Sequence, residues 1–340
     1  MPFFHTVGWK QKSHGFESVF PAEIGKGRKM IKYILRRILY MLLVLFIVTT
    51  ITFFLMHCIP GDPLTALVQK LPEQTKINYY AKYGLDKPVI EQYLVFLKGI
   101  FTEGTLGESI RFPGRQVLDT IQRYAGFSSE IGLVAVLIGF VVGIILGTVS
   151  AIKQNRLPDK IISIIAILGI SLPVFLLASL FQYLFTVKWP LFPTLGWGTP
   201  AHKILPILCM SFSPLATYTR YMRSSVLDVI NQDYITMAEA KGMSFSQVVR
   251  RHVLRNSILP SLTILGPNIA DVFTGSFVIE SIFAIPGLGS YYITAVNDRD
   301  FPMIIGCAMF YTGIYILSLL LVDILYVIID PRIRLTGDSN

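Results

Sequence analysis

The sequence predicts an all-α, polytopic membrane protein with about six transmembrane helices. Of its 340 residues, 53% are hydrophobic and only 15% are charged. Soluble domains have roughly a quarter charged residues, so this composition excludes an ordinary soluble protein. Runs without Asp, Glu, Lys or Arg recur along the chain. Each is close to the ~20 residues that a helix needs to cross a bilayer core.

The first part of the chain, residues 1–29, lacks apolar periodicity and is rich in Gly, Lys and Ser. No apolar stretch precedes Met30, so a cleavable signal peptide does not fit. We therefore predict that residues 1–29 are a disordered N-terminal extension, with an upstream choice of start site as the alternative. The first transmembrane helix is expected over 30–61, where a basic stretch runs directly into the charge-free run 38–61.

The next segment, 62–129, is predicted to lie outside the cytoplasm. Apolar side chains recur in it at helical spacing, at Val89, Tyr93, Phe96, Leu97 and Ile100 and again at Val117, Ile121 and Tyr124. This spacing predicts short amphipathic helices that lie on the membrane or on the helix bundle.

The remaining core, 130–335, is predicted to contain five further transmembrane helices, and 336–340 form a tail. The runs that we assign to these helices are 131–152, 161–187, 204–221, 258–283 and 301–322. The runs 204–221 and 258–283 each contain two prolines. Membrane helices tolerate proline where their neighbours satisfy the freed backbone carbonyls.

The orientation follows from the short loops, because Lys and Arg collect in cytoplasmic loops. Basic residues are concentrated before the first predicted helix, between the second and third, in the loop 228–257 and near the chain end. Both termini and the loop 228–257 are therefore expected to be cytoplasmic. The loops 188–203 and 284–302 are expected outside.

The cytoplasmic loop between the predicted fourth and fifth helices has the sequence of two short helices. Asp233 can cap the first helix, Lys241 suits its negative C-terminal end, and Gly242 supplies the left-handed residue that ends it. Ser244 and Gln247 then match a capping box that opens the second helix. An ordinary cytoplasmic loop is the alternative, since capping-box matches are common in helical proteins.

Polar residues inside the predicted fifth helix are candidates for function. Asp271 stands in an apolar run, with Thr274 and Ser276 after it. A charge inside a membrane is costly unless it faces a partner, water or the bundle interior. These residues are therefore candidate pathway or interface residues, and a packing hydrogen bond is the alternative for Asp271.

Two other features have a structural interpretation. Asp323, near the end of the last predicted helix, is expected to pair with an Arg or Lys near the inner interface. Gly139, Gly143 and Gly147 recur at four-residue spacing. Such a ridge of small residues predicts close helix packing.

Catalytic chemistry is not predicted. The sequence has no recognisable nucleophile and base, paired carboxylates or phosphate-binding loop, so the chain is not expected to be an enzyme or to hydrolyse ATP itself. Cys58, Cys209 and Cys307 are far apart and have no partners at metal-ligand spacing, which predicts no metal and no cofactor. The net charge of +9 follows from membrane topology, and nucleic-acid binding is not expected.

A series of short motifs carries a resemblance to a known family. The motifs are Pro60-Gly-Asp-Pro63, Tyr83-Gly-Leu-Asp-Lys-Pro88, Gly104-Thr-Leu-Gly-Glu-Ser109, Ala238-Glu-Ala-Lys-Gly242, Arg255-Asn-Ser-Ile-Leu-Pro260, Ile285-Pro-Gly-Leu-Gly289, Asp298-Arg-Asp-Phe-Pro302 and Asp330-Pro-Arg-Ile-Arg334. Over 30–335 the chain resembles the oligopeptide and dipeptide permease branch of ABC importer membrane subunits. Only Ala238 and Gly242 fit the general Glu-Ala-Ala-x-x-x-Gly pattern of the family's cytoplasmic loop, so no role is carried over to Glu239.

The resemblance implies a type I ABC importer permease, a multi-pass protein of the bacterial plasma (inner) membrane in contact with lipid. It implies ATP-driven uptake of oligopeptides or dipeptides that an extracytoplasmic peptide-binding protein delivers. A second permease subunit and two ATP-binding ATPase subunits would complete the transporter. The first short helix of the cytoplasmic loop would be the coupling helix that docks on an ATPase subunit. Its coupling residues would be Asp233, Ala238, Ala240, Lys241 and Gly242.

Two alternatives remain open from the sequence. A permease of the same family could serve nickel or another small solute, because specificity rests largely with the binding protein. A self-sufficient secondary transporter belongs to a different class and would predict paired intramembrane charges and inverted repeats. Neither of those features stands out in the sequence.

Overall fold

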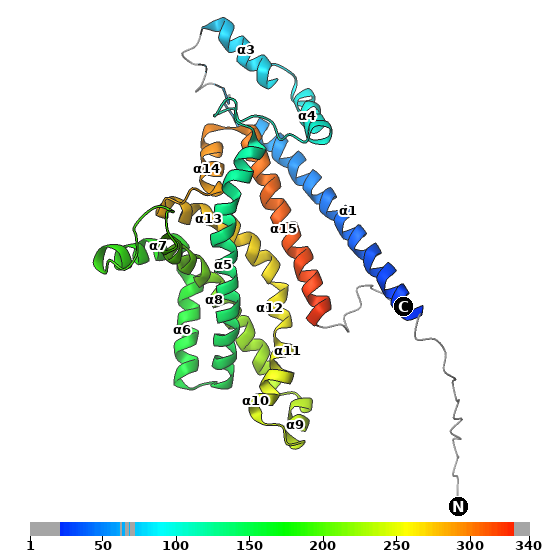
Figure 1. Ribbon diagram of the computed structural model, residues 1–340, viewed down its shortest axis with the longest axis vertical. Helices are drawn as coiled ribbons and strands as arrows, with labels where there is room; N and C mark the ends of the chain where they lie inside the picture. Colours follow the sequence, from blue (N-terminus) through cyan, green and yellow to red (C-terminus); the bar gives the residue numbers. More distant parts are fainter. Residues whose placement is uncertain (1–20, 62, 65–67, 69–71, 330–340) are drawn as a thin grey trace, which may run out of the picture.

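The computed structural model describes the backbone of residues 21–61, 63–64, 68 and 72–329 (Figure 1). The side chains of 21–34, 273–276 and 326–329 lie outside this description. Within the described residues the chain forms helices, with no β-structure beyond an isolated bridge between Glu108 and Gln116. The predicted all-α fold class is confirmed.

Helix α1 (Pro21–Cys58) contains the predicted first transmembrane helix. It begins well before Met30, so the part of the predicted extension at 21–29 is helical, where we expected disorder. Residues 1–20, the rest of that extension, lie outside the described residues. The apolar part of α1, Leu35–Cys58, is long enough to cross a membrane.

Helix α1 packs against the last helix, α15 (Phe301–Ile329) (Figure 1). An ion pair joins the two helices, with Arg37 Nη2 and Asp323 Oδ2 2.6 Å apart. The expectation that Asp323 has a basic partner is confirmed. The pair neutralises a carboxylate that would otherwise be costly in an apolar helix.

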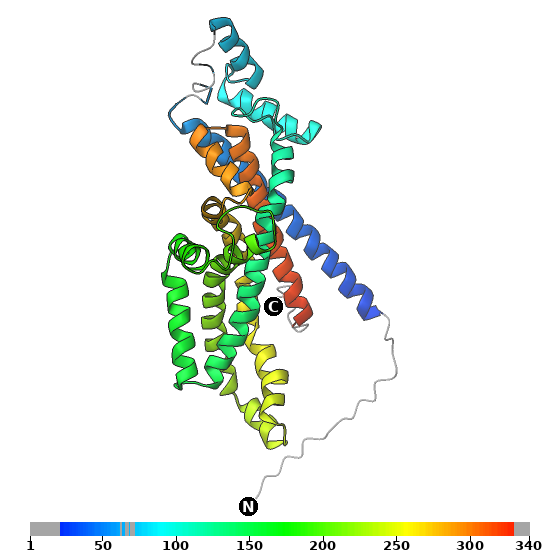
Figure 2. The same cartoon turned by 60° about the vertical axis from the view of Figure 1, so that its left-hand side comes forward.

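A group of short helices caps one end of the molecule, opposite the end that carries α9 and α10 (Figures 1 and 2). These helices are α3 (Glu73–Tyr83), α4 (Val89–Lys98) and the π-helical turn η1 (Gly99–Glu103). Tyr93 of α4 is buried against Phe53 of α1 and Ile305 of α15. Its hydroxyl lies 2.7 Å from Thr50 Oγ1. The amphipathic helix predicted after Pro88 is confirmed, and it packs on the bundle.

The centre of the fold is the pair α5 (Val117–Ile152) and α8 (Ala201–Ile230), which pack along much of their length. The short helix predicted at 117–124 is instead the first part of α5. A Cβ at Gly139 would lie 2.7 Å from Pro214 Cβ, and one at Gly143 would lie 2.6 Å from Tyr218 Cβ. The predicted glycine ridge therefore brings α5 against α8 at backbone distance.

Helix α8 contains the predicted fourth transmembrane run. It keeps Pro206 and Pro214 inside a helix of 30 residues, as expected for a helix with close neighbours. It is too polar to count among the helices that are apolar enough to span a membrane by composition. Its central position explains this polarity, because Ser211 and Thr219 are buried against other helices, away from lipid.

The predicted third helix, 161–187, is wrong as one continuous span. The structure divides it into α6 (Leu157–Ser171) and α7 (Val174–Gln182), which continues into the π-helical turn η2 (Tyr183–Lys188), with a bend of 107°. Leu172 is extended at the break, with ψ of 125°. Pro173 causes this, because proline lacks an N–H and disfavours a helical conformation in the residue before it.

The predicted fifth helix, 258–283, is also interrupted. It comprises α12 (Leu259–Thr263), which follows the short α11 (Leu254–Ser257), and α13 (Leu265–Phe283). The end of α13 then bends by 102° into α14 (Leu288–Asp298), so much of the expected outer loop is helical.

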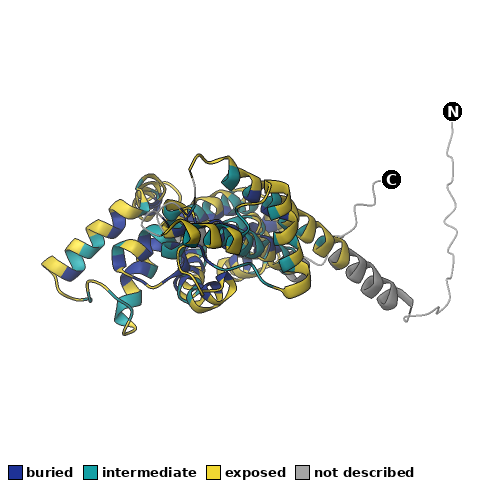
Figure 3. Ribbon diagram, turned by 90° about the horizontal axis from the view of Figure 1, so that it is seen from above, coloured by how far each residue is buried: buried dark blue, intermediate teal, exposed yellow. Residues whose placement is uncertain are grey.

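Three described helices are long and apolar enough to cross a membrane, and the number rises to five if each bent pair is one span. The three unbroken helices that meet this test lie in α1, α5 and α15. The count of six stays a prediction. Figure 3 shows buried residues along the centre of the molecule and exposed ones on its outer faces. Many exposed side chains there are large and apolar, such as Leu137 and Ile164, as expected for surfaces that face lipid.

Candidate functional site

The two short helices of the predicted cytoplasmic loop are present. The first, α9 (Asp233–Ala240), follows α8 after a break at Asn231 and Gln232. Gln232 occupies the N-cap position, so the predicted capping role of Asp233 is wrong by one residue. Asp233 is instead in the first turn, where its negative charge still favours the positive end of the helix.

The end of α9 follows the prediction. Lys241 is the C-cap residue, and Gly242 has φ of +84°, the left-handed conformation that ends the helix. The second helix, α10 (Phe245–Val248), opens with the predicted capping box. The backbone N–H of Ser244 donates to Gln247 Oε1 at 3.1 Å. The π-helical turn η3 (Val249–Val253) then carries the chain back to the bundle.

One face of α9 packs inward. Ile235 and Ala238 are 2% and 6% exposed, and they lie in an apolar cluster with Met222 and Val226 of α8 and Ala151 of α5. The methyl group of Ala238 therefore contacts this chain's own bundle. A close approach of Ala238 to a partner protein does not follow from this geometry.

The opposite face of α9 is exposed. Asp233, Met237 and Ala240 recur at helical spacing on that side and are all exposed, as are Lys241 and Gly242. The Met237 side chain is 59% exposed. Thus the structure brings Asp233, Ala240, Lys241 and Gly242 together on an accessible surface and separates them from Ala238.

Three large side chains on this surface were missed from the sequence. Tyr234, Met237 and Phe245 are each at least 40% exposed. Asn256 Nδ2 of α11 donates to the Tyr234 hydroxyl at 2.9 Å, which holds that ring in place. The sequence of α9 contains two pairs of large or apolar residues at i, i+3 spacing, Tyr234 with Met237 and Ile235 with Ala238. Only the pair Ile235 and Ala238 is buried, and the other pair was the signal that we missed. We call Tyr234, Met237 and Phe245, with the exposed face of α9, the docking surface.

A second polar location lies between α7, α8 and α13. A cavity of about 180 Å³ is lined there by Val174, Met210, Ser213, Pro214, Asn268, Asp271 and Val272. Asp271 is exposed, and it lines this cavity together with Ser213 and Asn268. The side chains of Thr274 and Ser276 lie outside the described residues. The polar residues that line this cavity with Asp271 are therefore Asn268, one turn earlier in α13, and Ser213 from α8.

Two buried carboxylates bind several groups at the opposite end of the molecule, and neither role was predicted from the sequence. Asp300, 1% exposed, accepts hydrogen bonds from Ser109 Oγ and from the backbone N–H of Ile110. Glu280, also 1% exposed, accepts one from Ser128 Oγ at 2.6 Å. The motif ending at Ser109 and the motif containing Asp300 are thus joined, and this end of the bundle is fixed.

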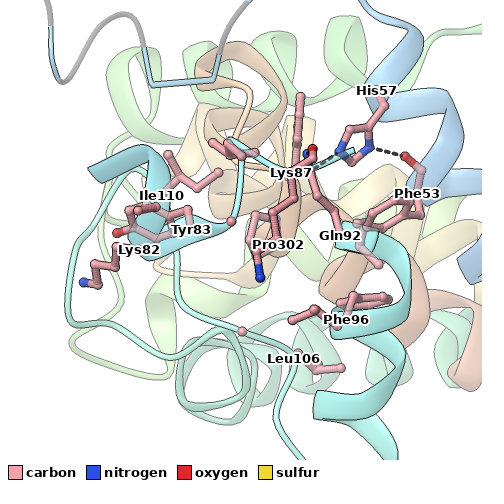
Figure 4. A pocket seen from close by; sticks show the side chains of 17 residues that line it. Phe53, His57, Lys82, Tyr83, Lys87, Gln92, Phe96, Leu106, Ile110 and Pro302 are labelled. Carbon is pink, nitrogen blue, oxygen red and sulfur yellow. Dashed lines mark hydrogen bonds between the residues drawn. The ribbon is translucent and has the colours of Figure 1, made fainter. Parts of the chain in front are cut away.

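A cavity of about 270 Å³ opens beside this end, between α1, α4 and the start of α15 (Figure 4). His57 and Gln92 face each other in it, with His57 Nε2 3.0 Å from Gln92 Oε1. Lys82 Nζ donates to Glu108 Oε1 at 2.7 Å, and this bond holds the pKa of Glu108 below its usual value. Burial and the nearby Glu108 raise the pKa of Tyr83. The Lys82–Glu108 ion pair should therefore persist at neutral pH and be lost only when pH falls through the lowered pKa of Glu108.

The described residues contain no group of three His, Cys, Asp or Glu side chains that could hold a metal ion. Cys209 and Cys307 are buried, whereas Cys58 is exposed at the end of α1.

Comparison with known proteins identifies the relatives of this chain. Residues 139–335 match the family described as "Binding-protein-dependent transport system inner membrane component", and 30–112 match the N-terminal part described for the same systems. The dipeptide transport system permease protein DppB of Bacillus subtilis is 41% identical over 306 residues, covering 90% of this chain and 99% of that protein. The oligopeptide transport system permease protein OppB of Haemophilus influenzae is 36% identical over 307 residues, covering 90% of this chain and all of that protein.

Solved structures share the fold. The inward-facing MetNI methionine ABC transporter matches with a TM-score of 0.52 at 16% identity, covering 62% of this chain and 96% of that chain. At 16% identity, this match is evidence of a shared fold and of nothing more. The family match over more than half of the chain and the near full-length relatives lead to one conclusion: the chain is a multi-pass inner-membrane protein that belongs to the family of binding-protein-dependent transport system inner membrane components.

Proposed function

We propose that this protein is the permease subunit of an ATP-driven importer for dipeptides or oligopeptides. The observation that carries the proposal is the similarity over 90% of the chain to permeases named for dipeptide and oligopeptide transport. The chain would supply one wall of the pathway and no ATPase site of its own. A second permease subunit, two ATPase subunits and an extracytoplasmic peptide-binding protein would complete the transporter.

The docking surface is the proposed contact with an ATPase subunit. It belongs to a short helix pair, α9 and α10, at one end of the bundle (Figure 1). The Met237 and Phe245 side chains are 59% and 50% exposed. Large exposed apolar side chains at the centre of a contact are typical of protein interfaces. Asp233, Ala240, Lys241 and Gly242 belong to the same contact, and Ala238 supports it from inside.

The other polar regions have proposed roles in the same cycle. The fixed end around Asp300 and Glu280 would receive the loaded binding protein. The recess at Asp271 would line the pathway or contact the second permease, with Thr274 and Ser276 on the same helix. Movement of α9 would shift the bundle between inward-open and outward-open states.

The test is purification of the complex followed by reconstitution. The tagged chain, expressed with the gene products encoded beside it, should bring down an ATPase and a second permease. Liposomes containing this complex should take up a radiolabelled dipeptide or tripeptide only when ATP and the binding protein are present. Uptake of nickel with no uptake of peptide would overturn the substrate, and a homodimer that transports without ATP would overturn the importer.

The orientation can be tested by cysteine labelling. In a variant without its native cysteines, single cysteines replace Ser246 of α10 and Glu103 of η1, which are both exposed. Because Lys and Arg collect in cytoplasmic loops, Glu103→Cys should react with an impermeant thiol reagent in intact cells, or in spheroplasts where an outer membrane blocks the reagent. Ser246→Cys should react only after the membrane is opened. Labelling of the Ser246 site in intact spheroplasts would contradict the proposed topology.

The polar recess gives a prediction for Asp271. Asp271→Asn should retain uptake, because an amide keeps a hydrogen-bonding group of the same shape in the recess that Ser213 and Asn268 also line. Asp271→Leu should lower uptake per assembled complex about tenfold, because it replaces the charged group of a polar recess with an apolar side chain. Uptake of labelled peptide, normalised to the amount of complex, measures both variants. Normal uptake by Asp271→Leu would exclude Asp271 from the pathway and from the interface.

A further inference from the structure

An ion pair between a buried carboxylate and a partly exposed guanidinium lies near the base of the docking surface. Asp159, in the first turn of α6, is 4% exposed. Arg223 of α8 donates to it through both arms of its guanidinium, from Nε to Oδ1 at 2.8 Å and from Nη2 to Oδ2 at 2.8 Å. A bidentate pair of this kind fixes the orientation of the two helices as well as their separation.

The carboxylate of Asp159 also accepts hydrogen bonds from the neighbouring elements. Ser150 Oγ near the end of α5 donates to Oδ1, and the backbone N–H of Asn155 donates to Oδ2 at 2.8 Å. Asn155 lies in the α5–α6 turn with φ of +63°, so a left-handed residue holds the turn in the shape that presents its N–H. One side chain therefore ties together the end of α5, the turn, α6 and α8.

This network adjoins the cluster that holds α9. Ala151 follows Ser150, and Met222 precedes Arg223 in the sequence. Both Ala151 and Met222 belong to the apolar cluster that buries Ile235 and Ala238 of α9. The cluster that holds α9 therefore contains residues next to Ser150 and to Arg223 in the chain.

Stability alone does not explain the pair. Desolvation of the buried Asp159 carboxylate offsets much of the Coulomb attraction, and solvent at the partly exposed Arg223 screens that attraction further. A pair with fixed geometry does, however, favour one relative arrangement of its helices over others. That property is needed where helices must move together.

We propose that Asp159 and Arg223 are positioning residues that make α5, α6, α8 and α9 move as one rigid body when an ATPase subunit moves the docking surface. The proposal rests on the proposed function for the source of the movement. Without the pair, α9 would shift relative to α6, and ATP hydrolysis would no longer be converted fully into transport.

The experiment uses the purified complex with spin labels on cysteines at Leu157 and Glu239, which are exposed on α6 and α9. The distance between them should be narrow and unchanged by a non-hydrolysable ATP analogue in the otherwise unaltered protein. In Arg223→Lys, which keeps the charge and loses the bidentate geometry, the distribution should widen or shift with the analogue. Basal ATPase activity should persist, while peptide uptake per complex should fall about tenfold.

Two further variants keep the outcome decisive. Arg37→Lys changes a different Arg–Asp pair, which joins α1 to α15, and should alter neither measurement. Asp159→Asn is nearly isosteric with the original residue and should have the same effect on both measurements as Arg223→Lys. It replaces Arg223→Lys in the test if the Arg223→Lys complex assembles poorly. An unchanged distance distribution, a widened distribution with normal uptake, or loss of assembly alone in both variants would each overturn the proposal. If the unaltered complex takes up no peptide, the proposed substrate fails, and the distance measurement still tests the rigid body.

Discussion

Met237→Asp should abolish transport while the protein still inserts into the membrane at a normal level. The Met237 side chain is 59% exposed, so the change should alter the free energy of unfolding by no more than about 0.5 kcal/mol. At the centre of the docking surface, a charge in place of an apolar anchor should weaken binding of the ATPase subunit by about 2 kcal/mol or more, roughly thirtyfold in affinity. Co-purification of the ATPase subunit and uptake of labelled peptide measure the effect.

The control is Ile77→Asp on α3, at the opposite end of the molecule (Figure 1). Ile77 is also an exposed apolar side chain, 54% exposed, so the substitution is matched in chemistry and exposure. It should leave the amount of co-purified ATPase subunit unchanged. Normal co-purification of the ATPase subunit with Met237→Asp would show that the ATPase contacts another part of the chain.

Gly143→Leu should prevent accumulation of the folded protein. A Cβ at this position would lie 2.6 Å from Tyr218 Cβ and 2.9 Å from the Leu215 carbonyl oxygen. The α5–α8 pair would have to separate along the centre of the fold, which should cost about 3 kcal/mol or more. The amount of monodisperse protein on detergent size-exclusion chromatography and its melting temperature report this loss.

The matched substitution is Gly126→Leu in the same helix. A Cβ at Gly126 meets nothing within 4 Å, so the side chain can be accommodated without moving α8. Its effect on the free energy of unfolding should be within about 0.5 kcal/mol. Equal yields and melting temperatures for the two variants would mean that the glycine ridge does not set the helix spacing.

Local features of the docking surface were predictable from the sequence. The end of α9 at Gly242 and the capping box at Ser244 and Gln247 are as expected. Both depend on interactions within four residues of the chain, so local residue types suffice to specify them. The face of α9 that is exposed was not predictable in this way. Ala238 fits the family pattern but is buried, because α5 and α8 supply an apolar cluster on that side.

Hydropathy predicted where the chain is apolar but not the direction in which it runs. The run 161–187 is apolar throughout, yet it bends by 107° at Pro173. The run 204–221 is less apolar than the helices of α1, α5 and α15 that could span a membrane by composition, yet α8 lies at the centre of the bundle. A hydropathy sum counts residues in one segment, whereas bends and burial depend on backbone conformation and on which helices are neighbours.

The sequence by itself determined that this is an all-helical membrane protein of the binding-protein-dependent transport family, because composition, charge-free runs and ordered motifs are properties of the chain alone. Only the tertiary structure decided which polar residues meet. Asp300 joins Ser109, Glu280 joins Ser128, and Arg223 joins Asp159 across 191, 152 and 64 positions respectively. No local sequence pattern predicts such pairs, because a buried carboxylate accepts hydrogen bonds from whichever donors the packing of the helices places beside it.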